Sequence, residues 1–225
     1  MKILAIDTAL GAASACLFDA VSNEVLARET IWLDRGHDQA IIPLVDRVIA
    51  DRGGPSLIER IAVTVGPGSF TGIRVGISAA RAIGLAVGVP VVGVSTLSAY
   101  VAPIMLEWSD GVAAAAIDAR HGRIYVAALA GGAPIIAPRI AAPREAVRAM
   151  GSGPLRLAGS SAAALAIEAW SMGVAAEVVS DAKAPDIAFV ARLGAAADPG
   201  SAPPRPLYLK APDVTASVSA ALPVA

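Results

Sequence analysis

Two aspartates could take part in phosphate chemistry, because each closes an Ala-Ile-Asp stretch. Asp7 is followed by Thr8 and, three positions later, by Gly11. Carboxylates hold Mg²⁺, and a glycine lets the backbone approach a phosphate. Asp118 is followed instead by an Ala-Arg-His sequence, whose side chains would crowd a phosphate, so we expect weak or absent nucleotide hydrolysis. The candidate nucleotide contacts are Asp7, Thr8, Gly11 and Asp118. In the competing interpretation, Asp7 only ends a strand and caps local N–H groups.

A glycine-rich loop, Gly66-Pro67-Gly68, stands before a long apolar segment. A phosphate-binding P-loop would need a lysine after its last glycine, but Thr71 stands five positions after Gly66 and no lysine follows. A dinucleotide fingerprint would need a third glycine at position 71. The spacing therefore excludes both motifs and favours a tight turn from a strand into a helix.

Other catalytic constellations are also incomplete. The chain has two histidines, His37 and His121, and no H-E-x-x-H sequence, so we expect no metal site and no metallopeptidase. Ser69, His37 and Asp7 could in principle form a hydrolytic triad, but Ser69 lacks the G-x-S-x-G context of a nucleophile elbow.

Composition limits the possible partners and the compartment. The net charge is −1, which gives no general attraction to nucleic acid, so we expect RNA to be reached only through a partner protein. The single cysteine, Cys16, lies in an apolar run and fits a reducing compartment. The apolar run at the N-terminus is too short for a secretory signal, and Pro90 interrupts the uncharged stretch 82–106. We expect a cytoplasmic protein that does not span a membrane.

Two helices are predicted in the first hundred residues, at 37–50 and 71–87. The second carries a stripe of small residues every four positions, and glycines inside a helix imply the close approach of another backbone. The small residues of the stripe are Gly72, Gly76, Ala80, Gly84 and Gly88. Packing on the chain's own sheet is one explanation. We prefer a contact with a helix of another subunit, flanked by Arg74 and Arg81.

Strands and helices alternate along the chain, and the pattern at Asp7 begins again at Asp118. The sequence therefore predicts an α/β protein with two related lobes. We expect an N-terminal lobe at 1–100, a smaller C-terminal lobe at 101–210 and a flexible tail at 211–225.

Several motifs together resemble the TsaB (YeaZ) family. They are KILAIDTA, RGHDQAIIPLVD, VGPGSFTGIRVGISAARAIGLA, VPVVGVSTLSA, AIDARHGRIY and PLYLK, which span residues 1–210. Family members often have serine after the histidine of RGHDQA, where this chain has Asp38.

The resemblance implies an actin/Hsp70/sugar-kinase (ASKHA) fold of two ribonuclease-H-like lobes with mixed sheets flanked by helices. It also implies a non-catalytic scaffold that binds and stabilises TsaD in the synthesis of N6-threonylcarbamoyladenosine in tRNA, within a complex that includes TsaE. Homodimers would use the same two helices, and ATP or ADP with Mg²⁺ would bind only at the partner interface. The implied interface residues are His37, Ile41, Leu44, Val45, Val48, Gly72, Arg74, Gly76, Ile77, Ala80, Arg81 and Gly84. The alternatives are an ATP-dependent phosphotransferase that uses Asp7 and Asp118, and a glycoprotease-like peptidase.

Overall fold

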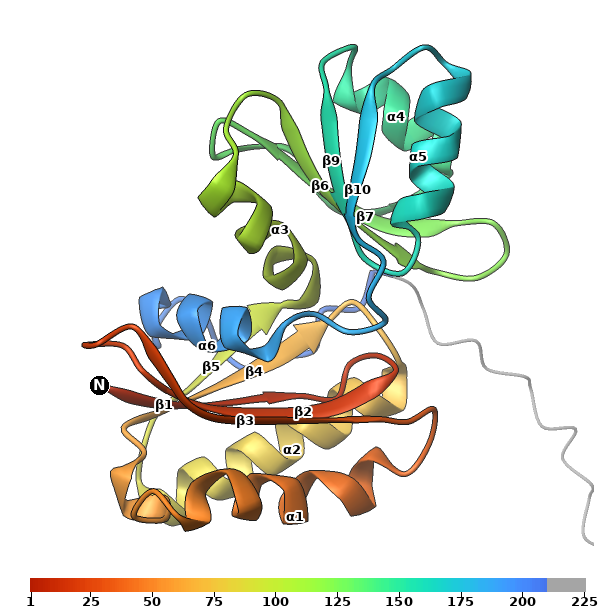
Figure 1. Ribbon diagram of the computed structural model, residues 1–225. Helices are drawn as coiled ribbons and strands as arrows, with labels where there is room; N and C mark the ends of the chain where they lie inside the picture. Colours follow the sequence, from red (N-terminus) through yellow and green to blue (C-terminus); the bar gives the residue numbers. More distant parts are fainter. Residues whose placement is uncertain (210–225) are drawn as a thin grey trace, which may run out of the picture.

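The computed structural model describes residues 1–209, so the predicted tail at 211–225 lies outside the described residues. Two five-stranded sheets form two lobes, one above the other in Figure 1. The first half of the chain contains β1 (Lys2–Asp7), β2 (Ala12–Asp19), β3 (Glu24–Trp32), α1 (His37–Ala50), a 3₁₀ turn (Pro55–Leu57), β4 (Arg60–Gly66), α2 (Phe70–Val87), β5 (Val91–Ser95) and α3 (Thr96–Glu107). The second half contains β6 (Val112–Asp118), β7 (Ile124–Ala130), β8 (Ala133–Ala141), α4 (Pro143–Met150), β9 (Leu155–Ala158), α5 (Ala162–Ser171), β10 (Ala176–Ser180) and α6 (Ile187–Ala196).

The two sheets have the same topology. The first has the order β3-β2-β1-β4-β5 and the second β8-β7-β6-β9-β10. In each, three antiparallel strands are followed by two strands parallel to the central one. Asp7 and Asp118 end the two central strands, β1 and β6. The repeat predicted from the sequence is therefore a structural repeat of two ribonuclease-H-like lobes, and the predicted fold class is confirmed.

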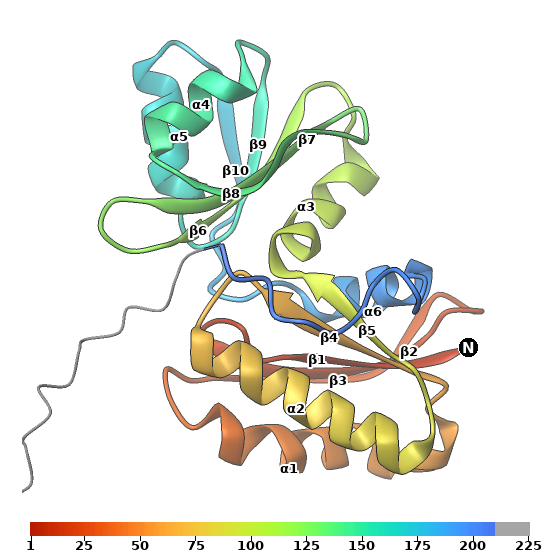
Figure 2. The same ribbon diagram turned by 180° about the vertical axis from the view of Figure 1, so that it is seen from behind.

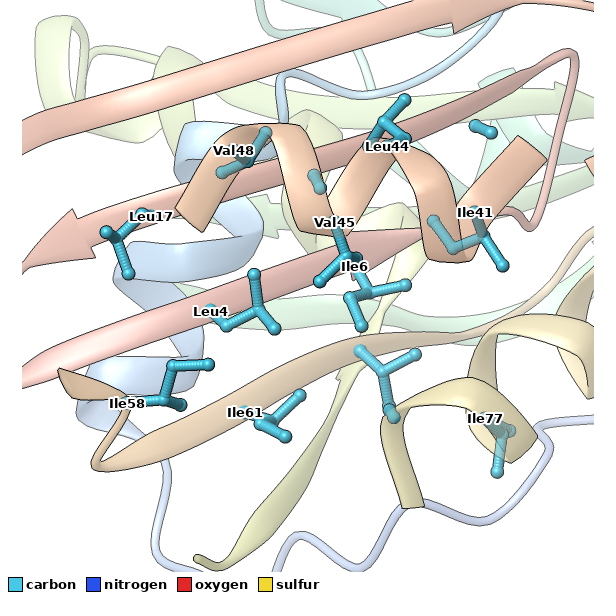
Figure 3. Close-up of a cluster of buried hydrophobic side chains, with 14 of the residues drawn as sticks. Leu4, Ile6, Leu17, Ile41, Leu44, Val45, Val48, Ile58, Ile61 and Ile77 are labelled. Carbon is cyan, nitrogen blue, oxygen red and sulfur yellow. The ribbon is translucent and has the colours of Figure 1, made fainter. Parts of the chain in front are cut away.

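Helices α1 and α2 cover one face of the first sheet (Figures 1 and 2). The apolar residues at helical spacing in α1 point into this core, where Leu44 and Ile41 lie against Leu4, Ile6 and the neighbouring strands (Figure 3). Burial of an aliphatic side chain contributes about 1.5–3 kcal/mol. The amphipathic pattern of α1 is thus explained by the sheet of its own lobe.

The remaining faces are covered by helices exchanged between the lobes. Helix α3 follows the last strand of the first sheet but packs on β6 and β7 of the second, whereas α6 follows the last strand of the second sheet and packs on β1, β2 and β4 of the first. The expected lobe boundaries assigned α6 to the C-terminal lobe, and in this respect they differ from the structure. Alternation of elements does not reveal that each lobe donates its last helix to the other.

Two arginines hold the exchanged helices at corresponding places. Arg60, at the start of β4, donates hydrogen bonds to the carbonyl oxygens of Gly194, Ala195 and Ala197 at the C-terminal end of α6, at 2.8–3.0 Å. Arg156, near the start of β9, lies over the ring of Trp108 at the end of α3, with 5.0 Å from its guanidinium carbon to the ring centroid. The cation at the end of each helix also complements the helix dipole.

Residues 198–209, here called the C-terminal strap, return along the edge of the first sheet. Gly93 N donates to Ala202 O at 2.9 Å, and Leu207 N donates to Val65 O at 2.7 Å. Arg81 of α2 donates to Pro204 O at 2.7 Å. The strap therefore covers the edge of β5 and fastens α2 to the sheet.

Helix α2 has the length and apolar composition of a membrane span, with a mean hydropathy of 1.3. It is the one helix among residues 1–209 that meets this test. Its small-residue side packs on the first sheet, which explains the apolar residues on that side of the helix.

Candidate functional site

Asp7 is fully buried at the end of β1. Its Oδ1 accepts hydrogen bonds from the Thr64 hydroxyl and, at 3.0 Å, from Ala9 N. Its Oδ2 has no partner among the described residues. Burial raises the pKa of the Asp7 carboxyl, and the bonds from Thr64 and Ala9 oppose the shift. This carboxyl is turned into the protein and caps the local backbone, as in the second of the two interpretations weighed from the sequence.

The other candidate residues near Asp7 also make contacts within the protein. The Thr8 hydroxyl is buried and donates to Gly72 O at 2.7 Å. Gly11 lies beside Lys183, whose Cβ would be 3.6 Å from a Cβ at Gly11. His37 begins α1, and its Nε2 donates to Leu10 O at 2.8 Å, which ties the helix to the β1–β2 turn. None of these groups faces a common reaction centre.

Asp118 is exposed, in contrast to Asp7. Its Oδ1 accepts a hydrogen bond from Arg120 N at 2.8 Å, and its own N–H donates to Ser160 Oγ at 3.2 Å. Arg120 and His121 have φ values of +64° and +53°, in the left-handed region that favours glycine. Asp118 is therefore open to solvent, whereas the Asp7 carboxyl is enclosed by the protein.

A cleft of about 460 Å³ separates the lobes on the side of Asp118. Among its lining residues are Leu10, Phe70 and Thr71 from the first lobe and Arg120 and Tyr125 from the second. Leu207, Tyr208 and Leu209 of the C-terminal strap complete the wall. Asp7, Thr8 and Gly11 do not line it.

Four of the five small residues of the stripe lie against the chain's own first lobe, which corrects the preferred explanation from the sequence, and the fifth, Gly88, is exposed and caps the end of α2. A Cβ at Gly72 would stand 2.1 Å from Thr8 O, and one at Gly76 would stand 2.5 Å from the Thr8 hydroxyl oxygen. A Cβ at Gly84 would stand 2.5 Å from Val91, and Ala80 is fully buried. The stripe admits α2 to the sheet, so it is not available to a helix of another subunit.

The other predicted interface residues on α1 and α2 also make contacts within the chain. The apolar ones belong to the core of the first lobe: Ile41, Leu44, Val45, Val48 and Ile77. Arg74 and Arg81 are exposed, but both hold the C-terminal strap, through Tyr208 and Pro204. Periodicity identified the buried side of each helix, because the apolar side of an amphipathic helix faces the nearest sheet.

The outward sides of α1 and α2 form a surface that sequence reasoning missed, here called the outer face. Its exposed members include Ile42, Pro43, Ala82, Leu85 and Ala86. Ile42 is 51% exposed and Leu85 is 86% exposed. The available signal was the presence of apolar residues, such as Ala82, Leu85 and Ala86, outside the small-residue stripe of α2.

Metal ligands and nucleophiles do not form a centre in the part of the chain that the structure describes. Residues 1–209 contain no group of three or more His, Cys, Asp or Glu side chains that could hold a metal ion. Cys16 is buried, and burial raises the pKa of its thiol to about 12, so its thiolate form is disfavoured.

Comparison with known proteins shows which families and structures this chain resembles. A family model described as "TsaD: tRNA N6-adenosine threonylcarbamoyltransferase" matches residues 25–197. The tRNA threonylcarbamoyladenosine biosynthesis protein TsaB of Escherichia coli (strain K12) is 40% identical over 131 residues, which are 56% of this chain and 53% of that protein. This chain is a member of the TsaB/YeaZ family. TsaB of Bacillus subtilis (strain 168) is 31% identical over 126 residues, again 56% of this chain and 53% of that protein.

The match to the TsaB/YeaZ family extends over both lobes in a solved structure. YeaZ from Pseudomonas aeruginosa superposes with a TM-score of 0.71 at 25% identity, covering 92% of this chain and 99% of that one. An uncharacterized protein of Mycobacterium tuberculosis, Rv3421c, is 30% identical over 213 residues, or 94% of this chain and 92% of that protein. By sequence alignment, the chain spans about half the length of the TsaB proteins that it matches.

Proposed function

We propose that this protein takes part in the synthesis of N6-threonylcarbamoyladenosine in tRNA as a non-catalytic subunit that binds and stabilises a TsaD partner. The names of the TsaB relatives and the description of the matching family model support the pathway. In this proposal TsaE joins the complex, and any ATP or ADP with Mg²⁺ binds at the interface with the partner.

The burial of Asp7 and the surroundings of Asp118 support a non-catalytic role. Mg²⁺ and phosphate need carboxylates that are accessible and close together. Asp7 is buried and bonded to Thr64, while Asp118 lies on the cleft wall beside a turn that carries large side chains. A phosphotransferase that used both aspartates would require the Asp7 carboxyl to become accessible.

The observation that carries the docking proposal is the outer face of α1 and α2. Leu85 and Ile42 stand on helices whose other sides are filled by the sheet, so their exposure has no role within the lobe. Exposed apolar residues that share one face are typical of protein interfaces. A stable interface covers about 800 Å² on each partner, which the outward sides of two helices of 14 and 18 residues can supply. The same face would serve a homodimer, which then competes with TsaD.

The test is Leu85→Asp, measured by co-purification with TsaD and by light scattering of the mixture. Leu85 is 86% exposed, so the substitution should change the free energy of unfolding by less than about 0.5 kcal/mol. A charge buried in an apolar contact should weaken association by about 2 kcal/mol or more, roughly 30-fold. Leu106→Asp is the matched control, since Leu106 is 72% exposed on α3, away from the outer face.

Equal binding of TsaD by the Leu85 and Leu106 variants would reject the outer face as the docking site. The enzyme alternative has a separate test, which is ATP turnover by the purified chain with Mg²⁺. Robust turnover that Asp7→Asn removes would overturn the non-catalytic role whatever the result with TsaD.

A further inference from the structure

The turn between β6 and β7, residues 119–123, presents three cation-capable side chains to solvent. Arg120, His121 and Arg123 are all exposed, and no ion pair of either arginine occurs among residues 1–209. The turn is held by hydrogen bonds from Ala119 N to Arg123 O at 3.0 Å and from Arg123 N to Arg120 O at 3.1 Å. These residues, here called the basic turn, are thus fixed in place rather than spread along a loop.

An aromatic pair faces the basic turn across the interlobe cleft. Phe70, at the start of α2, stacks on Tyr208 of the C-terminal strap with ring centroids 4.5 Å apart. The Arg74 guanidinium carbon lies 3.8 Å from the centroid of the Phe70 ring, and Arg74 Nε donates to the Tyr208 hydroxyl at 3.0 Å. Tyr208 is 41% exposed, so part of the pair remains open to a ligand. Aromatic pairs beside arginine are platforms on which unpaired bases stack.

The cleft joins these two features, because Arg120 lines it together with Phe70 and Tyr208. Its volume of about 460 Å³ suits one small-molecule-sized group. His121 and Arg123 do not line the cleft, so the cationic surface continues beyond it. A polymer with successive phosphates fits such an extended surface better than a free nucleotide does.

We propose that the cleft and the basic turn bind an unpaired segment of RNA directly. One base stacks on Tyr208 and Phe70, and the neighbouring phosphates lie on Arg120 and Arg123. The Asp118 carboxylate, which would repel a phosphate, accepts a hydrogen bond from a ribose 2′-hydroxyl. The proposal rests on the proposed function in tRNA modification, and it goes beyond the expectation that RNA is met only through a partner.

The test measures fluorescence anisotropy of a labelled single-stranded oligoribonucleotide with the full chain, over a series of low salt concentrations. The double variant R120Q/R123Q should bind less tightly, and its slope of log K against log salt should fall by about 1.4, for two lost phosphate contacts on a single strand. The matched control is R139Q/R148Q, which removes two exposed arginines from the same lobe and should leave affinity and slope unchanged.

The aromatic platform is tested separately. Tyr208→Ala should weaken RNA binding by roughly 5- to 150-fold, while Tyr208→Phe keeps the stacking and should stay near wild type. Trp170→Ala is the control, because Trp170 is 57% exposed on α5 and does not line the cleft. RNA should bind more tightly than DNA of the same sequence, and Asp118→Ala should reduce that difference.

Three results would overturn the proposal: no RNA binding at low salt, equal losses in the test and control variants, or AMP competing as well as the oligonucleotide on a nucleotide basis. The outcome is independent of the docking test, since TsaD binding is measured on the outer face and without RNA. If the chain binds TsaD but not RNA, the proposed function stands and the proposal of direct RNA binding is rejected.

Discussion

The two lobes share one strand order, yet the ends of their central strands differ. In the first lobe, β1 ends in a buried carboxyl that Thr64 and Ala9 hold inside the protein. In the second, β6 ends in the exposed Asp118 and the basic turn. The carboxyl at the end of the central strand is therefore buried in the first lobe, where it supports packing, and exposed to the cleft in the second. Equivalent positions of a repeat can therefore carry different roles.

The largest difference between the lobes should appear at their glycines. Gly72→Ala places a Cβ 2.1 Å from a backbone oxygen that cannot move freely, so we expect a loss of about 3 kcal/mol or more in the free energy of unfolding. Gly122→Ala in the basic turn meets nothing within 4 Å and should cost roughly 1–2 kcal/mol for its φ of +70°. Chemical denaturation measures both. Similar losses would show that α2 does not lie as close to the sheet as the structure places it.

The two arginines that hold the exchanged helices sharpen the comparison. Arg60→Ala removes hydrogen bonds to three carbonyl oxygens at the end of α6 and should cost about 2 kcal/mol. Arg156→Ala removes a contact with Trp108 and an exposed ion pair with Glu177, worth about 0.5–1 kcal/mol. Urea unfolding of the two variants shows directly which substitution lowers the free energy of unfolding more. A greater loss for Arg156→Ala would contradict the assigned role of Arg60.

The smallest effect is a pH dependence that belongs to Asp7. Burial raises its pKa in the folded protein above the ordinary value of 3.8, so the folded state holds the proton more tightly than the unfolded state. The resulting stability is fully present below that value and is lost as the pH rises through the folded pKa. Wild type should therefore lose stability relative to Asp7→Asn as the pH rises above 3.8.

The pH experiment compares wild type with Asp7→Asn, because the amide keeps the shape of the side chain and removes the titrating carboxyl. If the two proteins show the same dependence of unfolding free energy on pH, the Asp7 carboxyl is not buried as described.

Much of the fold was predictable, because the relevant signals are local. The Ala-Ile-Asp repeat located both central strands, and the helical period of α1 identified its buried side. Helix α4 and strand β8 were not predicted. The former has eight residues, and the latter carries Pro134 and Pro138, which are unfavourable in a strand interior.

The candidate site was less predictable, because its contacts are distant in sequence. The spacing of the glycines on α2 shows that a backbone comes close, but the partner atom, Thr8 O, is 64 residues away from Gly72. The pairing of Phe70 with Tyr208 depends on the path of the C-terminal strap. Leu85 looked like one more apolar residue of α2 until the sheet was seen to fill the opposite side.

The exchange of α3 and α6 has a consequence for synthesis on the ribosome. The first sheet forms from residues 2–95, but the helix that closes its second face ends at residue 196. During translation that sheet must remain with one apolar face uncovered while another hundred residues are added, at about 5–20 residues per second. The N-terminal half of the nascent chain therefore cannot complete its core until the C-terminal half has been synthesised. Chaperones are needed most during this interval, while the apolar face is exposed.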